Sequence, residues 1–259
     1  MNDPFLDSLI VWLNRPGVIG IALTGSYARG VQNQYSDVDV DIFVADLPEE
    51  SYTLQLFNGR LVSLKYLRLA DELSALTKPE KAVWAAPGLR QMKILLDDNG
   101  ELISLKHAAE NFNWHSLQDA ADKYAVEQLM GCAEEAQKIM GGLMQDDESK
   151  VLYASWGMFK NLSFAAAVQA GLMIESENKI FSIMQAHFNH RPAWVRAFRL
   201  SFGMDVQEGI PAYKTRGLAS LDLYKETALL FKDIINNKHR EVIENTLRLL
   251  SEFNESASR

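Results

Sequence analysis

The amino-acid sequence predicts an α+β protein, in which a first domain with a mixed β-sheet and flanking helices is followed by an all-α helical bundle. Two observations predict this division. Up to about residue 110, short apolar runs alternate with turn residues, whereas every long segment beyond Asn113 repeats its apolar residues at helical spacing. A chain of 259 residues can bury two modest cores. We therefore expect domains at residues 1–112 and 113–259.

The first domain should begin with a helix, a strand and a helical turn. Asp3 and Pro4 supply an N-cap and a proline at the first helical position, so a helix should run to about residue 15. Residues 18–23 are apolar and rich in β-branched side chains, and they stop at a glycine and a serine, which predicts a buried strand that enters a tight turn. A helical turn should follow at residues 27–30.

A change of period from residue 36 predicts the next strand. Aspartates alternate with apolar residues up to residue 42, two further apolar residues follow, and alternate residues of a strand point to the same face. Three carboxylates should therefore share one face of this strand, namely Asp37, Asp39 and Asp41.

A hairpin and a further strand complete the first domain. Two strands, at residues 52–57 and 60–67, should flank the dipeptide Asn58-Gly59, which is the strongest short-range signal for a hairpin turn. Residues 70–88 are expected to be helical with a break at Pro79, and residues 92–96 to form a short strand that ends in a turn.

The second domain should contain helices alone. The expected helices span about residues 117–144, 148–173, 177–188, 192–203, 217–236 and 239–254. Gly141-Gly142 and the region of Pro211 are expected to be loops, and the domain boundary should lie between about residues 110 and 118.

The turn after the first strand and the acidic strand together suggest a chemical function. Gly25 lets the backbone approach a ligand closely, and with Ser26 it offers N–H groups and a hydroxyl that suit phosphate oxygens. Asp37 and Asp39 point the same way and can hold a hard cation such as Mg²⁺. A Gly-Ser turn alone is commonplace, and alternating aspartates can form the solvent-exposed face of an edge strand. Their combination favours function, because like charges on one short strand repel one another unless a cation or solvent offsets them.

The stretch from Gly25-Ser26 to Arg29-Gly30, followed by Ser36-Asp37-Val-Asp39, resembles the motif of DNA polymerase β-type nucleotidyltransferases. Its longer form is similar to that of aminoglycoside nucleotidyltransferases and of small nucleotidyltransferase antitoxins. The antitoxins are much shorter than this chain. The motif similarity covers about residues 18–66. The resemblance implies an N-terminal nucleotidyltransferase domain at residues 1–112 and a helical domain at residues 113–259.

The resemblance also implies roles for single residues. Gly25 and Ser26 would contact the phosphates of a nucleoside triphosphate, and Asp37 and Asp39 would be the catalytic residues that ligate Mg²⁺. Two more residues match the motif as parts of the nucleotide site. Arg29 would reach a phosphate, and Ser36 would fix the loop before the acidic strand.

One position departs from the pattern. The family usually places a third carboxylate on a later strand, where it helps to bind metal or acts as general base, and the position that we align with it here is Ser63. Serine cannot perform that role. Either Asp41 substitutes, the helical domain supplies a base, or catalysis is weak or lost and nucleotide binding alone survives.

The resulting functional hypothesis is transfer of AMP from Mg·ATP to a hydroxyl of a small molecule, with aminoglycosides first among the acceptors. Two alternatives stay open. The chain could be a catalytically silent nucleotide-binding regulatory module, as Ser63 suggests, or it could transfer the nucleotide to a protein side chain.

Composition limits the partners. The net charge of −8 disfavours a nucleic-acid partner, because binding to a phosphate backbone relies on Lys and Arg. The single cysteine, Cys132, excludes an intrachain disulfide and makes the cytoplasm the expected compartment. The sequence predicts neither secretion nor membrane insertion.

Signals in the helical half are weaker. His187 and His190 have the spacing of a metal-binding pair, but a solvated helix end is the favoured interpretation, since no further ligands complete a site. For the aromatic residues and the cysteine we expect core packing, and for the lysines a solvated surface in preference to triphosphate contacts. These residues are Trp156, Phe159, Tyr224, Cys132, Lys160 and Lys225.

Overall fold

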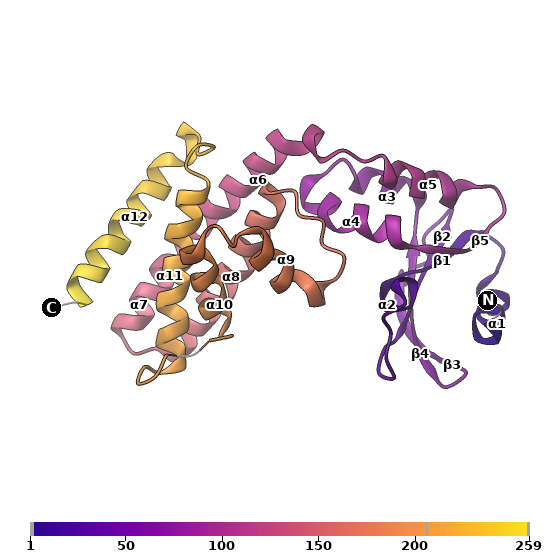
Figure 1. Cartoon of the computed structure of the whole chain (residues 1–259), viewed down its shortest axis with the longest axis horizontal. Coiled ribbons are helices and arrows are strands. Elements are labelled where there is room, and N and C mark those ends of the chain that lie inside the picture. Colours follow the sequence, from indigo (N-terminus) through magenta and orange to yellow (C-terminus); the bar gives the residue numbers. More distant parts are fainter. Residues whose placement is uncertain (1–2, 206, 258–259) are drawn as a thin grey trace. The chain divides into compact units, whose positions relative to one another are not determined.

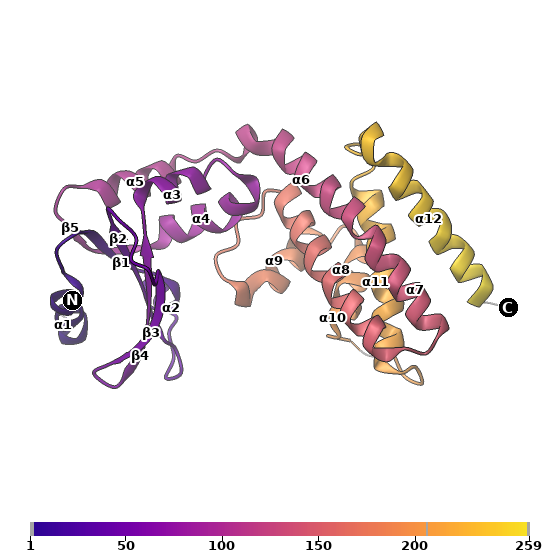
Figure 2. The same ribbon diagram turned by 180° about the vertical axis from the view of Figure 1, so that it is seen from behind.

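The computed structural model describes residues 3–205 and 207–257. The chain folds as two units: the first extends to His115 and includes Met173–Glu177, and the second contains Ser116–Leu172 and the chain from Asn178 onward. Among the described residues, every strand belongs to the first unit, and the second contains helices alone (Figures 1 and 2). This arrangement confirms the predicted α+β fold class.

A mixed sheet of five strands forms the centre of the first unit. The strands are β1 (Val18–Leu23), β2 (Val38–Val44), β3 (Tyr52–Phe57), β4 (Arg60–Leu67) and β5 (Lys93–Asp97). Their order across the sheet is β3-β4-β2-β1-β5. The β2 and β4 strands are parallel, whereas all other neighbours are antiparallel. Because β2 begins at Val38, Asp37 lies immediately before the strand rather than inside it.

The hairpin between β3 and β4 forms as predicted. Phe57 pairs with Arg60, so the loop has two residues, and both Asn58 and Gly59 adopt positive φ angles of 47° and 77°. This is the backbone of a type I′ turn, whose twist matches that of the flanking strands.

The α1 helix (Pro4–Leu13) packs on one face of the sheet. Its N-cap is Asp3, whose side chain accepts a hydrogen bond from the Phe5 N–H at 3.0 Å. Leu9 and Leu13 of α1 pack with the even-numbered residues of β2, from Val38 to Val44. The odd-numbered residues of β2, which include Asp39 and Asp41, therefore face the other side.

Three helices cover part of that other side. They are α3 (Leu69–Ala75), α4 (Pro79–Gln91) and α5 (Glu101–Glu110), and their apolar residues pack with Ala22 and Phe43. The short α2 (Gly25–Arg29) begins at Gly25, two residues earlier than predicted.

The α5 helix was not predicted. Its buried face consists of Leu102, Leu105 and Ala109, a stripe too narrow to stand out among the polar residues of a ten-residue segment.

The second unit is a helical bundle, as predicted. Its helices are α6 (Gln118–Gly131), α7 (Ala133–Met144), α8 (Glu148–Gln169), α9 (Ile180–His187), α10 (Pro192–Phe202), α11 (Ala212–Leu230) and α12 (Asn237–Ala257). Two short 3₁₀ helices precede α6 and α9, at Trp114–Leu117 and Glu177–Lys179. The helix expected at residues 117–144 is divided at Cys132, and α11 starts and ends earlier than expected.

The prediction of a loop at Gly141-Gly142 was wrong, because both residues lie inside α7. A Cβ atom on Gly142 would lie 2.8 Å from Val151 Cγ2, and one on Gly217 of α11 would lie 2.7 Å from Val151 Cγ1. Glycine at these positions lets α7 and α11 approach α8 closely. The need arises from packing between helices, which local sequence does not reveal.

Within the described ranges, no helix combines the length and the apolar character that crossing a lipid bilayer requires.

Gly217→Ala should lower the free energy of unfolding, because the new methyl group would overlap the stiff Val151 side chain. Overpacking of this kind costs about 1–3 kcal/mol, which should exceed the gain in helix propensity of up to about 1 kcal/mol. Urea unfolding measures the difference. Gly157→Ala is the matched control, because its Cβ would meet no atom closer than 3.6 Å, so it should stabilise. In a Val151→Ala background the penalty at position 217 should disappear; an unchanged penalty there would contradict the packing argument.

Candidate active site

The end of β1 lies directly against the acidic strand. The Thr24 N–H donates a hydrogen bond to the Asp39 carbonyl oxygen at 2.9 Å. Gly25 has a φ of 59°, and a Cβ atom built on it would lie 1.8 Å from Asp39 Oδ2. The Asp39 carboxylate therefore occupies the space that a side chain at position 25 would fill. Only glycine fits, which explains why the motif requires it.

Asp37 and Asp39 are close enough to affect each other electrostatically. Burial raises the pKa of the Asp39 carboxyl, the charge of Asp37 raises it further, and the Arg29 guanidinium opposes both effects. A divalent cation would relieve the repulsion between the two carboxylates. The described residues contain no group of three or more His, Cys, Asp or Glu side chains that could hold a metal. Two carboxylates suffice for Mg²⁺ only where phosphate and water oxygens complete its shell.

Arg29, in the last turn of α2, carries a positive charge toward this site. Its Nη1 donates to the Glu175 carbonyl oxygen at 3.2 Å, and its buried Nε has no hydrogen-bond partner among the described residues. Ser26 lies in the first turn of the same helix, next to Gly25. The structure thus brings together Gly25, Ser26, Arg29 and Asp39 around one turn.

Ser36 shapes the loop that leads into β2. Its Oγ accepts a hydrogen bond from the Asn33 N–H at 2.9 Å, and the Asn33 side chain accepts one from the Tyr35 N–H at 2.8 Å. These bonds hold the segment before Asp37 in a defined turn, in keeping with the loop-fixing role that the motif implies.

The parallel pairing of β2 with β4 decides which residue lies beside Asp39. Its partner is Ser63, which is 8% exposed and whose Oγ lies 3.4 Å from the Tyr52 hydroxyl. The position aligned with the third carboxylate therefore neighbours Asp39 across the strands, and it carries a hydroxyl rather than an acid.

Asp41 lies two pairs farther along β2, opposite Lys65 and on the same face as Asp39. Burial raises the pKa of the Asp41 carboxyl to about 7; the Lys65 ammonium opposes this shift, and the carboxylates of Glu72 and Asp39 add to it. Burial also raises the pKa of Glu72, on α3. Sequence reasoning missed Glu72, because only the packing of α3 on the sheet brings it near this strand.

Comparison with known proteins agrees with this geometry. Residues 10–98 match the family model of the nucleotidyltransferase domain. The chain is also similar in fold to a nucleotidyltransferase-like protein from Exiguobacterium sibiricum 255-15, with 18% identity, a TM-score of 0.50, and coverage of 92% of this chain and 79% of that one. A search of curated proteins found no match. Neither match identifies an acceptor.

The weaker candidates lie in the second unit, outside residues 10–98. Phe159 stacks on Phe198 with ring centroids 5.3 Å apart, and Tyr224 and Cys132 are buried, so these residues pack in the core as predicted. Burial raises the pKa of the Cys132 thiol to about 12, which makes it unreactive. The core prediction was wrong for Trp156, which is 51% exposed and whose ring lies under the Lys160 ammonium. No metal-binding group forms at His187 and His190 among the described residues.

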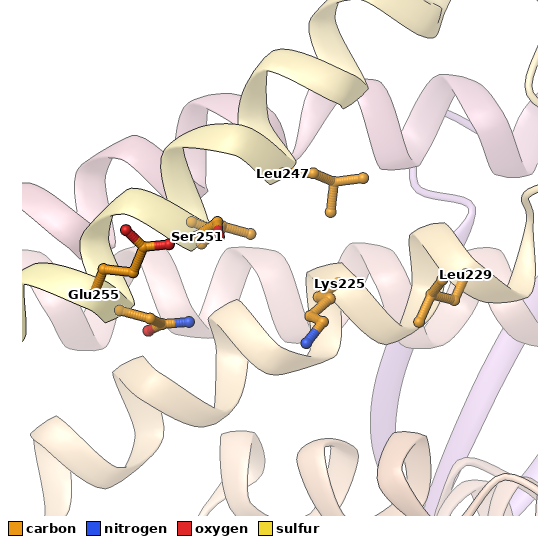
Figure 3. Close-up of a pocket in the computed structure, with 7 residues that line it drawn as sticks. Lys225, Leu229, Leu247, Ser251 and Glu255 are labelled. Atoms are coloured by element: carbon orange, nitrogen blue, oxygen red, sulfur yellow. The ribbon is translucent and has the colours of Figure 1, made fainter. Parts of the chain in front are cut away.

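A cavity of about 640 Å³ lies between α11 and α12 (Figure 3). It is lined by leucines, with Lys225 and Glu255 among its polar residues, and it contains none of the motif residues. Lys225 thus borders a cavity of the bundle.

Gly25→Ala should destabilise the protein more than Gly30→Ala. Both glycines have positive φ angles, of 59° and 70°, so each substitution adds backbone strain of about 1–2 kcal/mol. Only the Cβ at position 25 collides with Asp39, because nothing lies within 4 Å of one at position 30. Urea unfolding of both variants measures the excess. Equal losses of stability would show that Asp39 moves away freely.

Proposed function

We propose that this protein is a Mg²⁺-dependent nucleotidyltransferase that transfers a nucleoside monophosphate, AMP from ATP, to a hydroxyl group of a small molecule. The observation that carries the proposal is the contact between Gly25 and the Asp39 carboxylate within a domain of the nucleotidyltransferase family. That family typically uses a divalent metal and a nucleoside triphosphate. Aminoglycosides are the first acceptor candidates that the sequence motif suggests.

In the proposed reaction, the acceptor oxygen forms a bond to the α-phosphorus while the bond from that phosphorus to the bridging oxygen breaks and pyrophosphate leaves. Bound Mg²⁺ would neutralise phosphate charge and orient the reacting oxygens. Asp37 and Asp39 would hold it. The backbone N–H groups at Gly25-Ser26 and the Arg29 guanidinium would bind phosphate oxygens, which positions the α-phosphorus beside the carboxylates.

The proton of the acceptor hydroxyl must pass to a base. Ser63 cannot take it, although it is the residue beside Asp39. This observation favours one second candidate, a nucleotide-binding regulatory module with little or no turnover. The two functions share nucleotide binding and differ in pyrophosphate release. Nucleotide binding is therefore measured first and pyrophosphate release second.

Mg·ATP should stabilise the wild-type protein against heat, and Asp39→Asn should abolish the effect. A ligand that binds only the folded state stabilises it by about 2.7 kcal/mol at about 100 times its dissociation constant. Each nucleoside triphosphate is tested in Mg²⁺ and in EDTA, which also identifies the donor. Asp7→Asn, on the opposite face of the sheet, is the control and should keep the shift. If Asp39→Asn retains a full metal-dependent shift, the proposed site is wrong.

Ser63→Asp should increase the affinity for Mn²⁺ at least tenfold, or about 1.4 kcal/mol, because it adds a third carboxylate beside Asp39. The free Mn²⁺ signal in electron paramagnetic resonance measures the binding, with Ser63→Asn as the uncharged control. Pyrophosphate release with a panel of hydroxyl acceptors is then compared between wild type and Ser63→Asp. Turnover only in the variant would favour the regulatory module, and turnover in both would favour the enzyme. Equal Mn²⁺ affinity in all three proteins would remove position 63 from the metal site.

A further inference from the structure

Four large apolar side chains lie exposed on β3, at one edge of the sheet, and on its neighbour β4. They have exposed fractions of 54% for Tyr52, 50% for Leu54, 78% for Leu56 and 44% for Leu61. We call these four residues the apolar shelf. Three of them belong to β3, which is the edge strand (Figure 1). Edge strands usually carry charged residues that prevent association, so an uncharged, apolar edge indicates an interaction site.

The register of the sheet puts the shelf on the same face as the candidate catalytic residues. Asp39 pairs with Ser63, and Ser63 pairs with Leu54, so the three form one row across β2, β4 and β3. A second row lies beside it. Leu56 pairs with Leu61, and because Val38 pairs with Val62, the preceding residues Asp37 and Leu61 lie at the same level. Each of the two carboxylates therefore begins a row that ends on an exposed leucine.

The distances in this arrangement suit an acceptor. Neighbouring strands lie about 4.8 Å apart, so the β3 backbone is roughly 10 Å from that of β2. An acceptor whose hydroxyl reaches the site at Asp39 can therefore lay its remaining part on Leu54 and Leu56. The four shelf side chains offer phosphates neither an N–H donor nor a cation.

The four shelf residues carry no charge of their own. On the shelf face of β3 and β4, the charged side chain among the paired residues is Lys65, which lies opposite Asp41 of β2. The Arg60 guanidinium lies over the Phe5 ring, on the α1 side of the sheet.

We propose that the apolar shelf binds the apolar part of the acceptor, so that the substrate class is hydroxyl compounds that bear an aliphatic or aromatic group. This inference rests on the proposed function and concerns the acceptor side of that same site, where it puts such compounds ahead of the aminoglycosides that the motif suggests.

The test uses the full-length protein with ¹³C-labelled leucine methyl groups, titrated in the presence of Mg²⁺ with three probes. These are hexyl β-glucoside, methyl β-glucoside and kanamycin, a polycationic amino sugar. We expect hexyl β-glucoside to shift the methyl signals of Leu54, Leu56 and Leu61 and to bind at least tenfold more tightly than methyl β-glucoside. Kanamycin should leave these signals in place.

Leu56→Asn should abolish the preference for the hexyl compound. Val11→Asn is the matched control, because Val11 is also 78% exposed but lies on α1, on the opposite face of the sheet. Far-UV circular dichroism and urea unfolding verify that both variants fold. Leu54→Asn provides a second shelf variant.

Several results would overturn the inference: equal affinity for the two glucosides, a preference that survives both shelf variants, kanamycin shifts on the shelf, or a wild-type dimer that Leu56→Asn converts to a monomer.

The heat-stability assay with Mg·ATP is run in parallel. A nucleotide shift without hexyl preference overturns the acceptor inference alone. Hexyl preference without any nucleotide shift overturns the proposed function, and with it the assignment of the shelf to an acceptor.

Discussion

The candidate site depends on the close approach of Gly25 to the Asp39 carboxylate. A Cβ atom at position 25 would lie 1.8 Å from Asp39 Oδ2, so any side chain at this position would displace the Asp39 carboxylate. The Thr24 N–H bond to the Asp39 carbonyl fixes the same pair of segments through the backbone. This contact aligns a turn rich in N–H groups with an acidic strand, which are the two parts that phosphoryl-transfer chemistry needs.

The Asp37 and Asp39 carboxylates repel each other, and a bound cation would relieve this repulsion. The charge of Asp37 and burial both raise the pKa of Asp39, and Arg29 only partly offsets them. With Ser63 beside Asp39 in place of a third acid, the protein offers fewer ligands and less negative charge than the motif that its sequence resembles. A metal ion would therefore depend on the nucleotide for part of its coordination shell, which couples metal binding to nucleotide binding.

The alternation of side chains along the strands gives the sheet one face that packs on α1 and another that carries the candidate site. Even-numbered residues of β2 pack on α1, and odd-numbered residues form the opposite face, where α2 lies against Asp39. The same alternation on β3 directs Leu54 and Leu56 toward that face and Phe57 toward α1, where its ring stacks on Trp12. The candidate catalytic residues and the apolar shelf thus share one face, because a strand has only two faces.

The sequence by itself determined the features that depend on neighbouring residues. These are the α+β division, the Asn58-Gly59 hairpin, the helix that begins after Asp3, and the alternation that puts Asp39 and Asp41 on one face. Tertiary structure decided what depends on residues far apart in the chain. The pairing of Ser63 with Asp39 arises from a parallel pair of strands, Gly142 lies inside a helix because Val151 packs against it, and Glu72 approaches Asp41 through the packing of α3. Local propensity acts over a few residues, whereas strand register and close packing follow from the whole chain.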